Sequence, residues 1–219
     1  MKVYFVSGLA ADSRVFKNIL LPVYCTPVFL EWIVPLKNES LKNYALRLAA
    51  PIDTSGPFAI IGLSMGGMIA SEIARQYKPA ITVLISSVPC SKELPFYFKA
   101  AGALRLQKIV PVPLVKSGAM LKRVFTTETN EDKNILRAII RESDPKFIYW
   151  AMDAILKWRS DGFTESYIHI HGTSDEVLPI RFTKPTHIIA RGGHLMVMSR
   201  AREINTILRD VFQPQMQAD

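Results

Sequence analysis

Short apolar runs alternate with amphipathic stretches along most of the 219 residues. Apolar runs without helical spacing predict strands at residues 2–6, 27–32, 58–61, 80–86, 167–170 and 186–190. Stretches with apolar positions three or four residues apart predict helices at residues 13–21, 41–50, 65–77 and 196–212. Such alternation of strand and helix favours a mostly parallel sheet covered by helices. The fold class predicted here is therefore α/β, with a doubly wound sheet.

The alternation stops between residues 89 and 162, where only helical patterns occur. These predict helices at residues 94–108, 113–125, 131–142 and 145–158. An insertion that follows a strand end lies over the crevice where doubly wound sheets bind ligands, so we expect a helical lid. Because the apolar side of residues 145–158 suits packing on the sheet, we place the lid at residues 91–143. The core then consists of residues 1–90 and 144–219.

The chain is basic, with 27 Lys and Arg against 19 Asp and Glu, a formal net charge of +8. Basic proteins often bind nucleic acid, but the cationic residues are scattered here and no nucleic-acid-binding motif accompanies them. We therefore expect a basic surface and no nucleic-acid partner. One local asymmetry is the stretch of residues 94–127, which lacks acidic residues and contains Lys99, Arg105 and Lys108. It suits an anionic substrate or a membrane surface, although an ordinary lid with solvated lysines is favoured.

Cysteine use and hydropathy bear on the compartment. Cys25 and Cys90 show neither metal nor redox spacing, and the lack of a disulfide framework favours a reducing compartment, by default the cytoplasm. No stretch reaches the ~20 apolar residues of a membrane span, so no integral membrane segment is expected. Residues 2–11 also fit a brief signal peptide, but their apolar alternation favours a strand.

A sharp turn between strand and helix is predicted at Ser64, inside residues 58–74. Gly62 and Gly66 remove the side chains that would collide there, and Gly67 lets the helix start close to the sheet. Ser64 then stands in a strained conformation at a helix N-terminus, where unpaired N–H groups favour negative charge. A serine nucleophile that generates an oxyanion needs this environment. A Walker-type phosphate loop would need a lysine, and residues 58–77 contain none.

The Gly-x-Ser-x-Gly pattern at residues 62–66 resembles the nucleophile elbow of the α/β-hydrolase family. In that family an acid and then a histidine follow the serine, on loops after late strands. Residues 171–179 resemble the family's His-Gly-x-x-Asp-x-x-x-Pro stretch, which implies that Asp175 orients the base, with Glu176 as the alternative. Residues 191–194 resemble its Gly-His turn, which implies that His194 is the base.

Position along the chain separates the four histidines. His169 and His171 share one face of a strand and could chelate a metal, but no third ligand is apparent, so a structural role is favoured. His187 lies within or at the start of a strand. Only His194 follows a strand end on a glycine turn, where it can reach over the edge of the sheet.

The resemblance also implies an oxyanion hole made of two backbone N–H groups. One belongs to Met65, directly after the nucleophile. The other comes from the loop after the first strand, where Leu9 is the expected donor and Ala10 the next choice. In this loop Ser7 stands where the family has histidine, which can change how the loop is anchored.

Together these features imply a serine hydrolase that cleaves a carboxylic ester or thioester. Ser64 attacks the carbonyl carbon, His194 takes and returns the proton, and Asp175 fixes the His194 tautomer. No metal and no organic cofactor are required, and the expected partner is a small-molecule ester or thioester with an apolar acyl part. Two alternatives stay open: an acyltransferase of the same fold, and a binding or signalling module that keeps the pocket. Serine at position 64 argues against the haloalkane dehalogenase and epoxide hydrolase branches, which use aspartate there.

Overall fold

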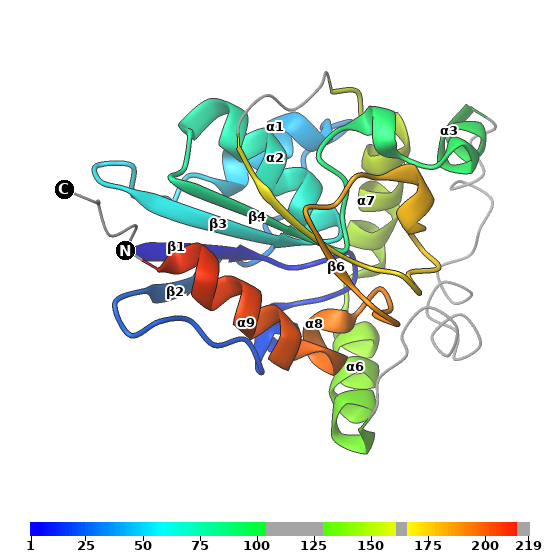
Figure 1. Ribbon diagram of the computed structural model, residues 1–219. Helices are drawn as coiled ribbons and strands as arrows, with labels where there is room; N and C mark the ends of the chain where they lie inside the picture. Colours follow the sequence, from blue (N-terminus) through cyan, green and yellow to red (C-terminus); the bar gives the residue numbers. More distant parts are fainter. Residues whose placement is uncertain (104–128, 161–165, 214–219) are drawn as a thin grey trace.

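The computed structural model describes residues 1–103, 129–160 and 166–213. Its centre is a sheet of six strands, all parallel, in the order β2-β1-β3-β4-β5-β6 (Figure 1). The strands are β1 (Lys2–Val6), β2 (Thr26–Phe29), β3 (Phe58–Leu63), β4 (Ile81–Ile85), β5 (Ile168–Gly172) and β6 (His187–Ile189). The predicted α/β class and parallel sheet are confirmed, and each predicted strand overlaps one of these six.

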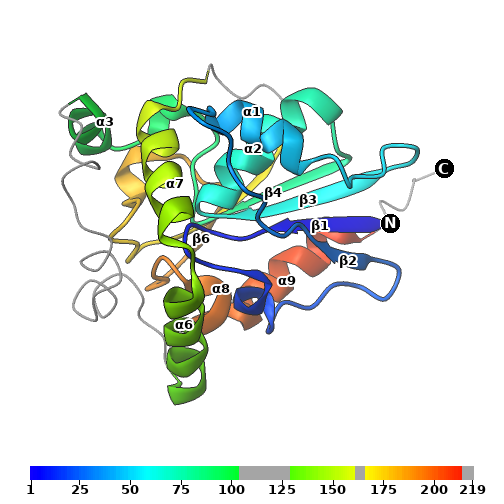
Figure 2. The same cartoon turned by 180° about the vertical axis from the view of Figure 1, so that it is seen from behind.

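Successive strand residues point into two separate hydrophobic clusters, because side chains alternate across a sheet. Tyr4 and Ile60 face one cluster, whereas Phe5 and Ile61 face the other. The first is covered by α1 (Leu41–Leu48), α2 (Met65–Tyr77) and α7 (Pro145–Lys157). The second is covered by the 3-10 helix η1 (Ser13–Phe16), α6 (Asn130–Glu142), α8 (Met196–Ser199) and α9 (Ala201–Phe212). Figure 1 and the view from behind in Figure 2 show these two layers on opposite faces of the sheet.

Local capping explains where several helices begin. Ser40 accepts a hydrogen bond from the Asn43 N–H at the start of α1, as its position predicts. Asp144 accepts from the Lys146 N–H, and Pro145 is the first residue of α7. None of the helices in the described ranges is long and apolar enough to cross a membrane.

The helix expected at residues 13–21 is shorter in the structure, where only η1 forms. After η1 the chain is held by Asn205 of α9, whose side chain accepts from the Leu20 N–H and donates to the Asn18 carbonyl, both at 2.9 Å. These long-range bonds replace the helical ones.

Two further boundaries differ from the expected ones. The strand expected at residues 27–32 ends at Phe29; beyond it, the Ile33 N–H and carbonyl both bond the Tyr44 hydroxyl instead of the sheet. The expected helix at residues 196–212 divides into α8 and α9 at Arg200, whose backbone leaves the helical conformation.

The expected lid at residues 91–143 is described at its two ends. The first end holds the short 3-10 helix η2 (Ser91–Glu93) and α3 (Phe96–Ala103), which covers the start of the helix expected at residues 94–108. The second end is α6, which buries Leu136, Ile139 and Ile140 in the same cluster as η1. The helix expected at 113–125, together with Arg105, Lys108 and the side chain of Lys99, lies outside the described residues. The lid therefore stays a prediction.

Candidate active site

Ser64 lies between β3 and α2 at the carboxyl edge of the sheet, with φ 53° and ψ −120°. This is a strained conformation for a residue other than glycine. The Ser64 N–H donates to the Ile85 carbonyl at 2.9 Å, which ties the turn to β4. A Cβ atom at Gly62 would lie 2.3 Å from the Gly66 carbonyl oxygen, and one at Gly66 would lie 2.2 Å from the Ser7 carbonyl oxygen. The two glycines are thus required by backbone contact, as the sequence predicts.

Ser64, His194 and Asp175 come from three different strand ends and meet in one hydrogen-bonded chain. The Ser64 Oγ atom lies 2.9 Å from His194 Nε2, and His194 Nδ1 lies 2.8 Å from Asp175 Oδ2. Asp175 and His194 are buried, with exposed fractions of 4% and 6%. Because a carboxylate only accepts, His194 carries a proton on Nδ1, and in the neutral ring Nε2 is then an acceptor that faces the Ser64 hydroxyl. This arrangement can remove a proton from Ser64.

The Asp175 carboxylate is held by several donors. Its Oδ1 atom accepts from the N–H groups of Val177 and Leu178, both at 2.9 Å, which leaves Oδ2 for His194. Burial opposes ionisation, but the nearby His194 and these hydrogen bonds outweigh it and lower the pKa of Asp175. Asp175 is therefore an anion at neutral pH. The alternative acid, Glu176, is exposed.

Direct contacts between the acid loop and the histidine loop set their separation. The Ser174 N–H donates to the Gly192 carbonyl at 2.9 Å, and the Arg191 N–H donates to the Thr173 hydroxyl at 2.8 Å. A Cβ atom at Gly172 would lie 2.0 Å from the Gly192 carbonyl oxygen. Glycine at the end of β5 therefore allows the approach that brings Asp175 and His194 into contact.

The loop after β1, which holds the expected donor Leu9, lies beside the serine. A Cβ atom at Gly8 would lie 3.3 Å from Ser64 Cβ. The Ser7 hydroxyl donates to the Ala11 carbonyl at 3.0 Å, so Ser7 itself anchors the loop. Within the described residues, neither the Leu9 N–H nor the Met65 N–H donates a hydrogen bond. Both N–H groups therefore stay predictions for the oxyanion hole.

The remaining histidines take no part in this chain through Ser64. His169 and His171 are both fully buried, and His169 Nε2 lies 3.2 Å from His171 Nδ1. No group of three residues able to hold a metal ion occurs among the residues that the structure describes. His187 Nδ1 pairs with the Thr186 hydroxyl at 2.9 Å.

Ser87 supports the elbow and was not singled out from the sequence. Its hydroxyl donates to the Ser64 carbonyl at 2.6 Å, and a Cβ atom at Gly67 would lie 2.4 Å from Ser87 Oγ. The available signal is a pair of serines directly after an apolar strand. These serines can be linked to the turn at Ser64 only when β4 is known to pair with β3.

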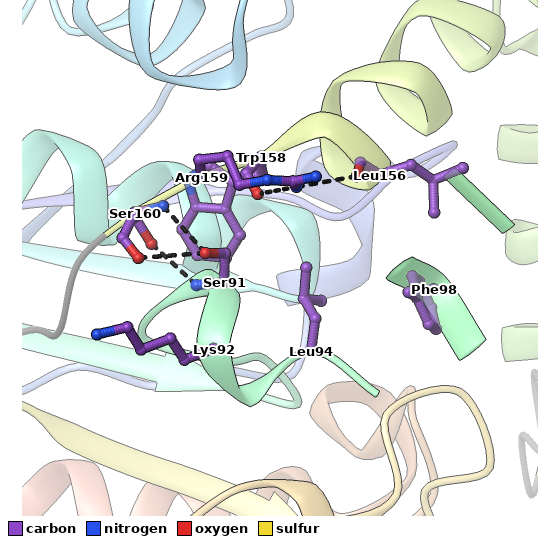
Figure 3. Close-up of a pocket in the computed structure, with 8 residues that line it drawn as sticks. All are labelled: Ser91, Lys92, Leu94, Phe98, Leu156, Trp158, Arg159 and Ser160. Carbon is purple, nitrogen blue, oxygen red and sulfur yellow. Dashed lines mark hydrogen bonds between the residues drawn. The ribbon is translucent and has the colours of Figure 1, made fainter. Parts of the chain in front are cut away.

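A separate pocket of about 440 Å³ lies between η2, α3 and the end of α7 (Figure 3). Its apolar lining consists of Leu94, Phe98, Leu156 and Trp158. The Ser91 hydroxyl donates to the Ser160 carbonyl at 3.1 Å and closes one side. The Arg159 guanidinium donates to the carbonyls of Leu156 and Trp158. None of the three residues of the Ser64 chain lines this pocket.

The fold and this site define the class of α/β-hydrolase-fold enzymes. Residues 35–207 match the sequence profile described as the alpha/beta hydrolase family. The chain therefore belongs to the alpha/beta hydrolase family and is an enzyme of the hydrolase type.

Solved structures agree on the fold. The malate-bound thermophilic esterase from Thermogutta terrifontis is 17% identical, with a TM-score of 0.72 over 97% of this chain and 89% of that chain. MenH from S. aureus is 16% identical, with a TM-score of 0.70 over 95% and 91%. Est816, described as an N-acyl homoserine lactone degrading enzyme, is 15% identical, with a TM-score of 0.72 over 96% and 92%. A comparison with curated proteins finds no match.

Proposed function

We propose that the protein is a serine hydrolase that cleaves a carboxylic ester or thioester through an acyl-enzyme intermediate. The observation that carries this proposal is the chain from Ser64 Oγ to His194 Nε2 at 2.9 Å and from His194 Nδ1 to Asp175 Oδ2 at 2.8 Å. A serine hydroxyl is a weak nucleophile at neutral pH, and a base held by a buried carboxylate overcomes this.

In the first half-reaction, Ser64 Oγ bonds to the substrate carbonyl carbon while its proton passes to His194 Nε2. Asp175 stabilises the imidazolium that forms. The carbonyl oxygen becomes an oxyanion, which accepts hydrogen bonds from the Leu9 and Met65 N–H groups. Collapse of this intermediate breaks the bond to the alcohol or thiol, which leaves with the proton from His194.

In the second half-reaction, His194 takes a proton from water as the water oxygen attacks the acyl carbon. Collapse of the second oxyanion releases the carboxylic acid and returns the proton to Ser64 Oγ. Each proton that His194 accepts is given back, so the enzyme is regenerated without a cofactor.

We infer a small-molecule substrate with an apolar acyl part, because the residue after the serine, Met65, belongs to the first hydrophobic cluster. Partly buried apolar side chains pack against the cluster that contains Met65, the residue after the nucleophile; they include Leu9, Trp32, Phe98, Trp150 and Val177. Sites for small ligands are mostly apolar, with a few polar groups that fix orientation. We also infer that residues 91–143 form a lid over this site, because α3 within them meets the acid loop, where the Tyr97 hydroxyl donates to the Val177 carbonyl at 3.5 Å.

Two free cysteines support a reducing compartment for this activity. Cys25 and Cys90 are both buried as thiols and are not joined to each other. Cytosolic proteins normally keep their thiols reduced. We therefore propose a cytoplasmic location, which fractionation of the source cells would test directly.

The test is hydrolysis of a graded series of p-nitrophenyl esters and acyl thioesters by the wild type and Ser64→Ala. We expect turnover that prefers an apolar acyl group and falls roughly 10⁶-fold in kcat without the serine. The matched control is Ser55→Ala, at an exposed serine, which should keep full activity. Equal rates in the wild type and Ser64→Ala would contradict the proposal. If an added alcohol captures most of the acyl group, the acyltransferase alternative holds.

A further inference from the structure

Two buried histidines lie inward of Asp175, next to the chain through Ser64. His171, on β5, places its Nε2 atom 2.7 Å from the Leu178 carbonyl oxygen and 3.4 Å from Asp175 Oδ2. On the other side of the ring, His171 Nδ1 lies 3.2 Å from His169 Nε2. Both histidines are fully buried. The mechanism above uses neither of them.

The contacts determine which nitrogen of each ring carries a proton. A backbone carbonyl only accepts, so the 2.7 Å contact requires a proton on His171 Nε2. In a neutral ring His171 Nδ1 is then an acceptor, and the facing His169 Nε2 must be the donor. In a neutral His169 ring, Nδ1 is then unprotonated; it has no hydrogen-bond partner in the described part of the chain.

Electrostatics also favours two neutral rings. Burial, helped by the neighbouring His171, lowers the pKa of His169 from 6.5 to about 3, although the Ser87 backbone opposes this shift. Burial lowers the pKa of His171 as well, although Asp175 and the Leu178 carbonyl oppose this shift. At neutral pH both rings are therefore uncharged.

We propose that neutral His171 is a positioning residue that holds the Leu178 peptide, and through it Asp175, in the geometry that orients His194. Leu178 is braced on both sides, since its N–H donates to Asp175 Oδ1 at 2.9 Å and its carbonyl accepts from His171. Without His171 this buried carbonyl loses its partner, and the acid loop gains freedom to move. This inference rests on the proposed function, in which Asp175 orients the base.

The neutral state of His171 is part of the role. A charged ring 3.4 Å from Asp175 Oδ2 would pair with the carboxylate and compete with His194 for its negative charge. A neutral His171 ring supplies a hydrogen-bond donor to the acid loop. It leaves the negative charge of Asp175 to stabilise the His194 imidazolium that forms during catalysis. His169 fixes this tautomer, because its Nε2–H donates a hydrogen bond to His171 Nδ1.

Three variants test the proposal by kinetics. His171→Gln can place an amide N–H near the position of Nε2, whereas His171→Met keeps the bulk and removes this donor. We expect the Met variant to lose roughly 10²-fold in kcat with little change in KM, and the Gln variant to recover most of the loss. His187→Gln, at a histidine outside the site, should match the wild type. Equal kcat in the wild type and the folded Met variant would overturn the proposal.

Nuclear magnetic resonance tests the same proposal without relying on turnover. In wild-type protein with ¹⁵N-labelled histidine, His171 should be the neutral Nε2–H tautomer near pH 7. A protonated Nδ1 or a charged ring would overturn the proposal, even if His171→Met does not fold. The hydrogen-bonded Nδ1–H resonance of His194 should persist in His171→Gln and shift or broaden in His171→Met. An unchanged resonance in the folded Met variant would contradict the proposal. A wild type with the predicted tautomer but no hydrolysis would instead contradict the proposed function alone.

Discussion

Replacing Asp175 with asparagine should reverse the tautomer of His194. The Val177 and Leu178 N–H groups, both 2.9 Å from Oδ1, require an acceptor there, so the asparagine carbonyl oxygen takes that position. Its NH₂ group then faces His194 Nδ1, where the 2.8 Å contact now needs an acceptor. His194 must carry its proton on Nε2, which points at Ser64 Oγ 2.9 Å away. Ser64 is left without a base.

The expected loss follows from this change of tautomer, because asparagine keeps the size of the side chain and most of its hydrogen bonds. An aspartate-to-asparagine change of this kind in a serine triad lowers kcat by about 10⁴. At 1.36 kcal/mol for each factor of ten, this equals roughly 5.5 kcal/mol of transition-state stabilisation. The KM value should change little, since Asp175 is buried behind His194 and does not reach the substrate.

The assay is steady-state hydrolysis of the best ester near neutral pH, with circular dichroism to show that each variant is folded. Glu176→Gln is the matched control, because it removes the adjacent, exposed carboxylate that the sequence left as the alternative acid. It should keep the wild-type kcat. If Asp175→Asn keeps more than about a tenth of kcat, or if Glu176→Gln loses more than Asp175→Asn, the tautomer argument is refuted.

Three further predictions concern stability, each measured by urea unfolding. Gly66→Ala should cost at least about 3 kcal/mol, because its Cβ would lie 2.2 Å from backbone oxygens, whereas Gly56→Ala meets nothing within 4 Å and should be neutral. Trp158→Phe should cost about 1–3 kcal/mol, since it removes the indole N–H that donates at 2.8 Å to the buried Glu72 carboxylate. The pKa of His169 falls from 6.5 to about 3 on folding, so the unfolded state binds more protons between these values. The unfolding free energy should therefore fall as pH drops from 6.5 toward 3, and His169→Gln should flatten this decline; an unchanged slope would contradict the assignment.

The sharp turn at Ser64 could be predicted from the sequence because its causes are local. A short apolar run, a helical period and glycines two residues on either side of Ser64 specify a strand, a sharp turn and a helix. The structure gives the helix the predicted bounds, Met65–Tyr77. Asp175 and His194 were identified through likeness to a family, since no spacing along the chain brings two such distant loops together.

What the sequence did not predict depends on contacts between distant segments. The helical pattern after residue 12 gives only η1, because Asn205 of α9 binds the following backbone. Ser87 bonds the Ser64 carbonyl only because β4 lies beside β3. His171 fits a chelating pair by spacing, but its partners are a carbonyl and a second buried ring. Periodicity and motif spacing do not encode such neighbours.

The central claim is that Ser64 is a nucleophile activated by His194. Treatment with a fluorophosphonate probe, followed by intact and peptide-level mass spectrometry, tests it most directly. The account predicts one adduct, on Ser64, which is absent in Ser64→Ala and nearly absent in His194→Ala because the base is gone. An adduct on a different serine, or no adduct on folded wild-type protein, would contradict it.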